Sequence, residues 1–324
     1  METQQDLVSI LICSRDRRRD LESVAKAFKG MATKYSFQIV AVEETDHPVP
    51  ISGITYVPHP VANRGIPYAR NLALAHATGA IIVFLDDDCR IHDGWSDKIL
   101  EAFKDDSVVG VQGGVTVPET TNALGWAESI LGFPGGGITR VWQAQGKVQE
   151  TREVSTLNCA YRRWVLDKIG GFDEMLKLGS EDNLLAKQAC DYGRCIFVPG
   201  AMVSHKARGS LAQIWKWFVR RGRAEVDLIR TGKQKDNNFW TVLKSSLAIK
   251  LAVLMITAIN LSAVWAAFLI TLGGFIYLFL QYARYVKPWR FSKSTLTALI
   301  VLPVVKLTMD MATDWGRFRG LFFA

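Results

Sequence analysis

The stretch Ala80-Ile-Ile-Val-Phe-Leu-Asp-Asp-Asp88 is the part of the sequence that decides the fold. Its apolar run is short and continuous, as in a strand that is buried on both faces of a parallel sheet. Three carboxylates then follow, at the strand end where doubly wound sheets bind their ligands. Adjacent carboxylates repel one another, and a divalent cation with oxygen ligands is the natural compensation. The alternative interpretation is an ordinary solvated acidic turn.

Upstream of this strand, apolar runs alternate with stretches of helical spacing. Strands are predicted at Val8–Cys13, Phe37–Glu43 and Ile54–Val57, and helices at Leu21–Phe28 and Tyr68–Ala77. Such alternation is typical of an α/β fold with a parallel, doubly wound sheet. We therefore expect a Rossmann-like, mostly parallel sheet flanked by helices.

The composition changes after residue 238. Leu247–Tyr282 is nearly all apolar and too long for one span of about 20 residues. It predicts a helical hairpin over about 244–285 that turns near Asn260-Leu-Ser262. A further apolar or amphipathic helix over about 295–311 fits a third span or an interfacial helix equally well. Two domains are thus expected, at 1–238 and 239–324.

The charge pattern favours a membrane partner over a nucleic acid. Lys and Arg total 39 against 31 Asp and Glu, which gives a net charge of +8. Much of the excess flanks the apolar region, where it suits anionic headgroups. The flanking basic residues are Lys206, Arg208, Lys216, Arg220, Arg221, Arg223, Lys244, Lys250, Arg284, Lys287 and Arg290. The positive-inside tendency places both hairpin ends in the cytoplasm.

The N-terminus and the cysteines agree with a cytoplasmic domain. Met1–Leu7 is polar and has no apolar core, so no secretory signal is expected. The five cysteines form no C-x-x-C pair, which predicts reduced, buried thiols. We expect a protein of the cell membrane whose catalytic domain is cytoplasmic.

Further candidate site residues lie in the second half of the soluble region. Glu181-Asp182 could supply a general base, or could simply begin a helix capped by Ser180. His205 follows a predicted strand and is either a metal ligand or a packed side chain. Arg220-Arg-Gly-Arg223 suits a diphosphate, a headgroup-facing surface, or both.

Read in order, several runs resemble the family 2 glycosyltransferases, which have the GT-A fold, over about residues 7–225. The runs of the first half are Val8-Ser-Ile-Leu-Ile-Cys-Ser-Arg-Asp-Arg17, Asn63-Arg-Gly-Ile-Pro-Tyr-Ala-Arg-Asn-Leu-Ala-Leu74, Ala77-Thr-Gly-Ala80 and Phe84-Leu-Asp-Asp-Asp88. Those of the second half are Asn158-Cys-Ala-Tyr-Arg-Arg163, Ile169-Gly-Gly-Phe-Asp-Glu174, Ser180-Glu-Asp182 and Phe197-Val-Pro-Gly-Ala-Met-Val-Ser-His205. Each run is unspecific alone, but the ordered set is specific.

The resemblance implies a role for each matching position. It places Cys13, Ser14 and Arg17 at the nucleobase, Glu43 at the base or ribose, Arg70 near the phosphates, and Asp86 and Asp87 on the nucleotide-sugar side. Asp88, with Asp86 and in our interpretation His205, would bind Mn²⁺ or Mg²⁺. Asp182 would be the catalytic base, positioned by Glu181, while Arg220, Arg221 and Arg223 would meet a diphosphate or the acceptor.

Two departures from the family pattern limit these assignments. The second strand ends in Glu43-Glu44, where paired aspartates are usual, so the nucleobase contact is less certain. The run Arg220-Arg-Gly-Arg223 replaces the Q-x-x-R-W of processive polysaccharide synthases. The second departure argues for transfer of a single sugar.

The expected function is inverting transfer of one sugar at the cytoplasmic membrane face. The donor would be a nucleotide-sugar and the acceptor a lipid-linked molecule or glycan, in cell-surface polysaccharide or glycolipid synthesis. Membrane lipids are expected partners and nucleic acid is not. One alternative is a sugar-nucleotide nucleotidyltransferase, although no Gly-rich loop follows Ser14–Arg19. The other is a non-catalytic membrane scaffold, which would be expected to lose Asp88 or Asp182.

Overall fold

The computed structural model describes residues 7–30, 35–233, 239–259, 263–285 and 293–323. The chain forms two compact units: Met1–Pro118 with Gly132–Lys206, and Glu119–Leu131 with Ala207–Ala324. The domain boundary expected at residue 238 stays a prediction. In the division into units, the residues from Ala207 onward and the short segment Glu119–Leu131 group with the C-terminal helices.

The first unit is built on a nine-stranded sheet in the order β3-β2-β1-β4-β8-β6-β9-β5, with β7 paired to β9. The strands are β1 (Leu7–Arg15), β2 (Ser36–Glu44), β3 (Thr55–His59), β4 (Ile81–Asp86), β5 (Cys89–Ile91), β6 (Val108–Thr116), β7 (Gln149–Glu150), β8 (Asn158–Arg162) and β9 (Arg194–His205). The predicted α/β sheet is confirmed, and all four strands expected in its first half form.

The sheet is parallel in its first half and mixed in its second. β1 pairs in parallel with β2 and β4, and β2 with β3. β8 runs antiparallel to both β4 and β6. The carboxyl ends of β1, β2 and β4 therefore share one edge, and the register brings Cys13 opposite Asp86 and Ser14 opposite Glu43.

Helices cover both faces of this sheet. The helices of the first unit are α1 (Arg18–Lys29), α2 (Ile66–His76), α3 (Trp95–Glu101), the 3₁₀ helix η1 (Ala102–Lys104), α5 (Gly137–Ala144), α6 (Arg163–Ile169) and α7 (Glu181–Ala189). Ile10 and Ile12 pack with residues of α1 and α3, whereas Leu11 between them packs with α2, α6 and α7. This alternation follows from the two-residue period of a strand.

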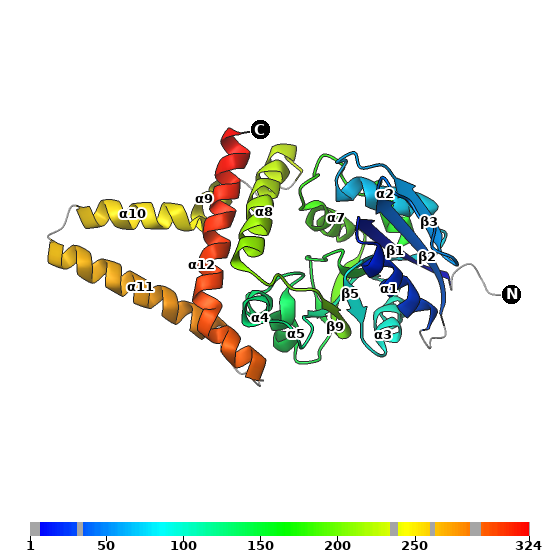
Figure 1. Cartoon of the computed structure of the whole chain (residues 1–324), viewed down its shortest axis with the longest axis horizontal. Coiled ribbons are helices and arrows are strands. Elements are labelled where there is room, and N and C mark those ends of the chain that lie inside the picture. Colours follow the sequence, from blue (N-terminus) through cyan, green and yellow to red (C-terminus); the bar gives the residue numbers. More distant parts are fainter. Residues whose placement is uncertain (1–6, 31–34, 234–238, 260–262, 286–292, 324) are drawn as a thin grey trace. The chain divides into compact units, whose positions relative to one another are not determined.

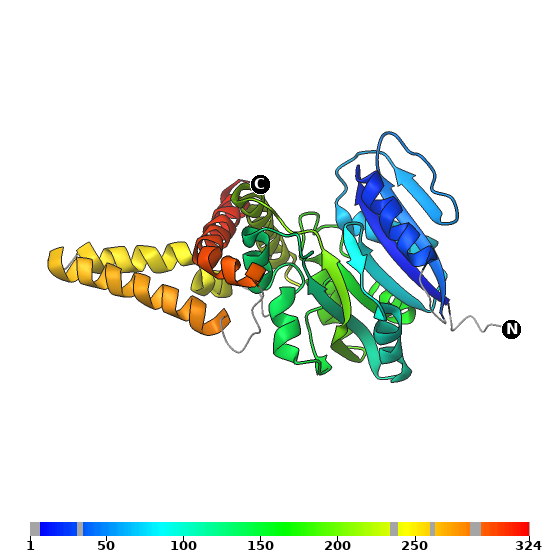
Figure 2. The ribbon, with the colours of Figure 1, turned by 60° about the horizontal axis from the view of Figure 1, so that its bottom comes forward.

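The second unit is helical and contains the apolar C-terminal region. Its helices are α4 (Ala123–Ile130), α8 (Leu211–Thr231), α9 (Phe239–Ser245), α10 (Leu247–Ile259), α11 (Ala263–Tyr285) and α12 (Lys293–Phe322). The views in Figure 1 and Figure 2 agree that α10 and α11 lie side by side, as the predicted hairpin requires. The expected turn at Asn260-Leu-Ser262 and the basic residues Lys287 and Arg290 lie outside the described residues.

Within the described ranges, two helices are long and apolar enough to cross a membrane, judged by length and composition. They are Ala263–Tyr285 and Leu296–Phe322. The pair α9–α10 would add a third span if the 61° bend at their junction is part of one segment. The further helix predicted to end near residue 311 instead continues to Phe322, because the segment after Met311 packs on α8 through Gly316 and Gly320.

Helices α8 and α12 approach closely through glycines. A Cβ atom at Gly222 would lie 2.1 Å from the carbonyl oxygen of Thr313, and one at Gly316 would lie 2.1 Å from that of Val219. Only glycine fits at such a contact, as in close crossings of membrane helices. Gly320, four residues after Gly316, makes a looser contact, since a Cβ there would lie 3.1 Å from the Val226 Cβ.

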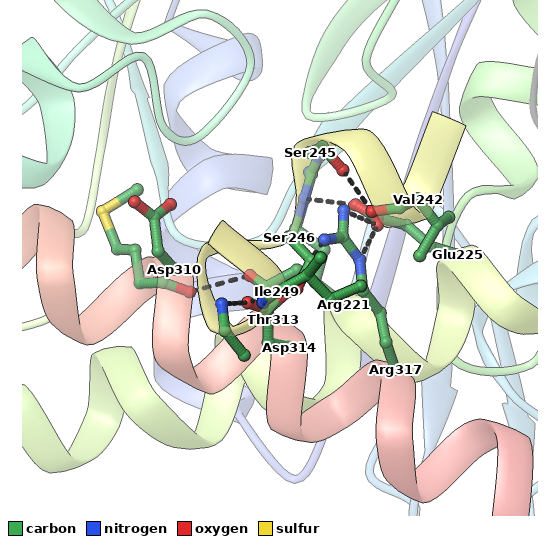
Figure 3. A network of polar contacts seen from close by, with 12 residues as sticks. Arg221, Glu225, Val242, Ser245, Ser246, Ile249, Asp310, Thr313, Asp314 and Arg317 are labelled. Atoms are coloured by element: carbon green, nitrogen blue, oxygen red, sulfur yellow. Dashed lines mark hydrogen bonds and ion pairs between the residues drawn. The ribbon is translucent and has the colours of Figure 1, made fainter. Parts of the chain in front are cut away.

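A polar network fastens α10 to this helix pair (Figure 3). Asp314 accepts hydrogen bonds from the Ser246 hydroxyl (3.0 Å) and the Ala248 amide (2.8 Å) at the start of α10. Arg317 donates to Asp314 (3.0 Å) and, through two nitrogens, to Glu225 of α8 (2.9 and 2.7 Å). The bend between α9 and α10 is therefore held by side chains of α12, which supply acceptors to the exposed helix N-terminus.

Candidate active site

Three predicted metal ligands meet at the carboxyl edge of β4. Ligand atoms of Asp86, Asp88 and His205 all lie within 4.8 Å of one another. The His205 Nε2 atom is 3.1 Å from Asp88 Oδ1 and 3.6 Å from Asp86 Oδ2. Asp86 ends β4, and His205 ends β9, where it pairs with Cys89 of β5. The sequence places the two elements more than a hundred residues apart, and the sheet brings their ends together.

The donor set of this cluster fits a divalent cation. Asp88 Oδ1 is buried and makes no hydrogen bond within the described part of the chain, although it faces the His205 ring nitrogen. A carboxylate oxygen buried without a donor is costly unless something positive joins it. Two carboxylates and one imidazole form a suitable ligand set for Mn²⁺, and the carboxylates alone suit Mg²⁺.

Arg17 supplies part of the positive charge that the acids require. Its two terminal nitrogens lie 2.8 Å from Asp87 Oδ1 and 2.8 Å from Asp88 Oδ2. Burial raises the pKa of Asp87 to about 7, although Arg17 opposes this shift. Within the described residues, the ionic contacts of Arg17 are with these acids, on the metal side of the predicted nucleotide region.

Arg70 links the metal cluster to the second acidic site. Its guanidinium forms an ion pair with Glu181 and lies 3.8 Å from Asp86, while its charge centre sits 5.6 Å from the Phe172 ring. Arg70 and Glu181 are both buried. Burial opposes ionisation of Asp86, but a hydrogen bond from His205 and the charge of Arg70 together lower its pKa.

Glu181 and Asp182 differ in environment although they are adjacent. Burial raises the pKa of Glu181 to about 7, with Arg70 opposing and Asp182 adding to the shift. Asp182 is only half-buried, and its Oδ1 accepts a hydrogen bond from the Asn183 amide (2.8 Å). Ser180 precedes them in the left-handed region (φ 71°) and makes no side-chain cap. A non-glycine residue held there is strained, as is common beside functional groups.

The predicted nucleobase residues gather on β1 and β2. Cys13 lies beside Asp86 in the sheet, and burial raises the pKa of its thiol to about 12, so the thiol is neutral. Ser14 is buried opposite Glu43. Glu43 accepts a hydrogen bond from the Tyr56 hydroxyl (2.6 Å) and pairs with Arg18 (3.3 Å).

The basic run after the acceptor half lies on α8, in the second unit. Arg221 approaches Glu225 (3.5 Å) and lies 6.0 Å from the Trp217 ring. Gly222, in the middle of the run, is buried against α12. The roles given to Arg220, Arg221 and Arg223 at a diphosphate or acceptor stay predictions.

Sequence reasoning missed three residues that support the site. Arg18 and Tyr56 hold Glu43, and the Phe172 ring lies beside Arg70. Phe172 belongs to the quoted run Ile169-Gly-Gly-Phe-Asp-Glu174, which marked the region but not the contact. Arg18 stands within a run of arginines whose individual directions no pattern could distinguish.

Comparison with known proteins decides the class of this site. Residues 41–170 match the family model described as glycosyl transferase family 2. The chain carries a family 2 glycosyltransferase domain. The matched residues include Arg70 and the three acids after β4, whereas Asp182 and His205 lie beyond them.

Relatives of this glycosyltransferase support the same class. It is 28% identical over 254 residues to the succinoglycan biosynthesis protein ExoM of Rhizobium meliloti, covering 74% of each chain. It is 25% identical over 163 residues to the glycosyltransferase AglE of Haloferax volcanii, covering 49% of this chain and 50% of that one.

A solved structure confirms the GT-A fold. The mannosyltransferase PcManGT of Pyrobaculum calidifontis, in complex with GDP-Man and Mn²⁺, superposes with a TM-score of 0.61 at 18% identity. The match covers 97% of this chain and 87% of that chain. The chain therefore has the GT-A fold, and its described residues include C-terminal helices long and apolar enough to cross a membrane.

Proposed function

We propose that this glycosyltransferase moves a single sugar, with inversion, from a nucleotide-sugar to a lipid-linked acceptor at the cytoplasmic membrane face. The observation that carries the proposal is the double contact of Arg70, which touches Asp86 at the metal cluster and Glu181 beside Asp182. One guanidinium thus joins the donor side of the site to the acceptor side.

Asp182 is the better candidate for the general base. Glu181 is buried and bound to Arg70, so its carboxylate is engaged in holding that side chain. Asp182 is half-buried, so a substrate hydroxyl can approach it. Its carboxylate would take the proton from the acceptor hydroxyl. The hydroxyl oxygen would then bond to the anomeric carbon from the face opposite the diphosphate, whose oxygen leaves with the bonding electron pair.

The residues around the acids would bind and orient the donor. Asp86, Asp88 and His205 would hold Mn²⁺ or Mg²⁺, which when bound supplies positive charge against the leaving diphosphate. Arg70 would add a fixed positive charge on the same side, held in place by Glu181 and Phe172. Glu43, fixed by Tyr56 and Arg18, would meet the base or ribose.

The lipid-linked acceptor rests on the apolar helices and the basic residues near them. ExoM acts in succinoglycan biosynthesis according to its name, which fits cell-surface polysaccharide synthesis here. The nucleotidyltransferase alternative loses support, because the family match covers the strand-end acids. Failure of the full chain, with its acids intact, to turn over any donor would support the non-catalytic scaffold instead.

The test is transfer by the full chain in detergent from a panel of UDP-, GDP- and dTDP-sugars. Each donor is supplied with Mn²⁺, Mg²⁺ or EDTA, and with a polyprenyl-diphosphate sugar or a free sugar as acceptor. We expect metal-dependent transfer from one donor to the lipid-linked acceptor, with inverted anomeric configuration by NMR. Asp182→Asn should lower turnover by roughly 10²–10⁴-fold. Equal transfer to free sugars would reject the lipid acceptor, and a retained configuration would reject the mechanism.

A further inference from the structure

Helix α12 has two opposite faces along its whole length. One face is a stripe of buried residues spaced three or four positions apart and packed on α4 and α8: Ala298, Leu302, Val305, Met309, Ala312, Gly316 and Gly320. The other is a stripe of exposed apolar residues with the same spacing: Leu296, Ile300, Val304, Leu307, Met311, Trp315, Phe318 and Phe322. We call this second set the apolar stripe.

The apolar stripe is too long and continuous to face water. α12 has 30 residues and is about 45 Å long at 1.5 Å per residue. Ile300 is 75% exposed at one end and Phe322 is 68% exposed at the other. Contiguous apolar patches of this extent mark a contact with lipid or protein.

The helix packed on the buried face, α8, argues against α12 being an ordinary membrane span. α8 is a polar helix that carries Lys216, Arg220, Arg221, Arg223, Glu225, Asp227 and Arg230. The contacts of Gly222 and Gly316 press α8 directly onto α12. A helix with so many charges does not enter the hydrocarbon core, so neither does the part of α12 packed on it.

Charges on α12 itself point the same way. Lys306 and Asp310 form an ion pair near the middle of the helix, and Asp314 and Arg317 continue the same flank. In a spanning helix the pair would lie near the bilayer centre, where ionisable groups are costly. In a helix lying flat, this flank would sit at headgroup level and the apolar stripe would face the acyl chains.

The hairpin provides the contrast. In α11, none of the apolar 18-residue segment is buried by the rest of the chain, whereas in α12 28% of the corresponding segment is buried. Figure 1 shows α10 and α11 leaving α12 crosswise, and Asp314 holds the start of α10 at that crossing. Helices that run across each other cannot both follow the membrane normal.

We propose that α12 is an in-plane interfacial helix whose apolar stripe rests in the bilayer surface, while the α10–α11 hairpin alone penetrates the membrane. The occupant of the stripe is lipid, because α12 contacts α10 of the exposed apolar hairpin and the stripe ends in Trp315, Phe318 and Phe322. Aromatic side chains of this kind favour the membrane interface. The inference does not depend on the transfer chemistry.

Spin-label depth measurements test this arrangement in the full chain, reconstituted in nanodiscs of phosphatidylcholine and phosphatidylglycerol. The parent variant replaces the two partly exposed cysteines, Cys13→Ser and Cys190→Ser. Single cysteines then replace Ile300, Leu307, Trp315 and Phe322, and Phe268, Phe275 and Phe279 on α11 serve as controls. The readout is accessibility to oxygen relative to a water-soluble nickel chelate.

An in-plane helix should give one shallow depth at all four α12 positions, within about 5–10 Å of the acyl boundary. The three α11 positions should differ in depth. A spanning α12 would instead spread its labels over about 33 Å of depth, with Leu307 deepest, and would overturn the proposal. Labels shielded from both reagents, with spin–spin broadening, would show a second copy on the stripe and would also overturn it. Where one labelled variant misfolds by circular dichroism, Val304 or Met311 on the same stripe replaces it.

Discussion

The acids after β4 and the α8–α12 junction both bury charged groups, yet only one of them balances its charges. At the junction every carboxylate oxygen of Asp314 and Glu225 faces a donor. At the end of β4, Asp88 Oδ1 makes no hydrogen bond among the described residues, and burial raises the pKa of Asp87 to about 7. Of the two, only the strand edge keeps a buried carboxylate oxygen that no described residue donates a hydrogen bond to, which favours an added positive charge.

The difference separates a structural network from a binding site by its energetics. When any member of a closed network is removed, the free energy of unfolding falls, because the partners of that member stay buried without compensation. In a cation-binding site without its cation, buried carboxylates repel one another and lose hydration. Removing one of them should therefore stabilise the fold while it abolishes function. Mutations of similar chemistry should therefore have opposite effects on stability in the two places.

Among the changes that test this contrast, the largest effect is expected for Asp88→Asn. Loss of one cluster carboxylate should lower metal-dependent kcat/KM by roughly 100-fold or more, because the charge opposite the leaving group is held less well. Turnover with saturating Mn²⁺ measures it. Asp93→Asn, an exposed acid in the turn that follows, is the matched control and should stay near wild type. A variant as active as the wild type would remove Asp88 from the cluster's function.

Next in size is Gly316→Ala at the helix crossing. The added Cβ would collide with the Val219 carbonyl, so we expect a loss of about 1–3 kcal/mol in the stability of the second unit. Gly274→Ala on α11 is the control, since no atom lies within 4 Å of its added Cβ. Thermal unfolding in detergent compares the two. Equal melting temperatures would contradict the close crossing.

The expected opposite effects on stability are tested by comparing Asp314→Asn with Asp87→Asn, both in EDTA. Asp314→Asn should destabilise the start of α10 by roughly 1–3 kcal/mol, because the amide nitrogen cannot accept the bonds that the carboxylate accepts. Asp87→Asn should stabilise the β4 region by roughly 1–2 kcal/mol at pH 8. Hydrogen exchange of peptides from α10 and β4 measures each region separately.

The pH dependence of Asp87 has a definite direction. Because its pKa is raised in the folded state to about 7, the folded chain binds this proton more tightly than the unfolded chain. Its contribution to stability is therefore present at low pH and is lost as the pH rises from about 4 to 7. Asp87→Asn should remove that slope, and an unchanged slope would assign it to other groups.

The smallest effect concerns Cys190, at the C-terminal end of α7. A hydrogen bond with Cys195 lowers the pKa of Cys190 to about 7, with burial opposing and Arg152 assisting. Its alkylation by iodoacetamide should rise with pH through 7 and exceed that of Cys13 by roughly tenfold or more. Mass spectrometry of the labelled peptides measures both rates. Cys195→Ser should shift the profile of Cys190 to higher pH.

The sequence was sufficient for the parts of the site that follow from strand order. Asp86 ends a buried strand, Asp88 lies in the turn directly after it, and His205 ends another strand, so their approach to a common edge follows from the topology of such sheets. The contacts of Arg17 with Asp87 and Asp88 could not be predicted, because the sequence does not show which of the neighbouring arginines points toward the acids.

The composition of the second unit could not be predicted from the sequence, for a different reason. Glu128 pairs with Arg208 across 80 positions, and the segment that carries Glu128 joins the C-terminal helices. The hydrophobic periodicity within a segment does not predict a contact between segments so far apart in the sequence. The two faces of α12, by contrast, are both apolar, so hydropathy alone fits a span and an interfacial helix equally well, and the packing on α8 is the observation that favours the proposed interfacial helix.

The glycine crossing of α8 and α12 has a practical consequence for anyone who wants a water-soluble form of this enzyme. Cutting the chain after α8 would strip the cover from Gly222 and Val226 and leave Glu225 without Arg317. The remaining helix would expose an apolar groove and invite aggregation. Removing the hairpin alone, and rejoining α9 to α12 by a polar linker, would keep that groove filled.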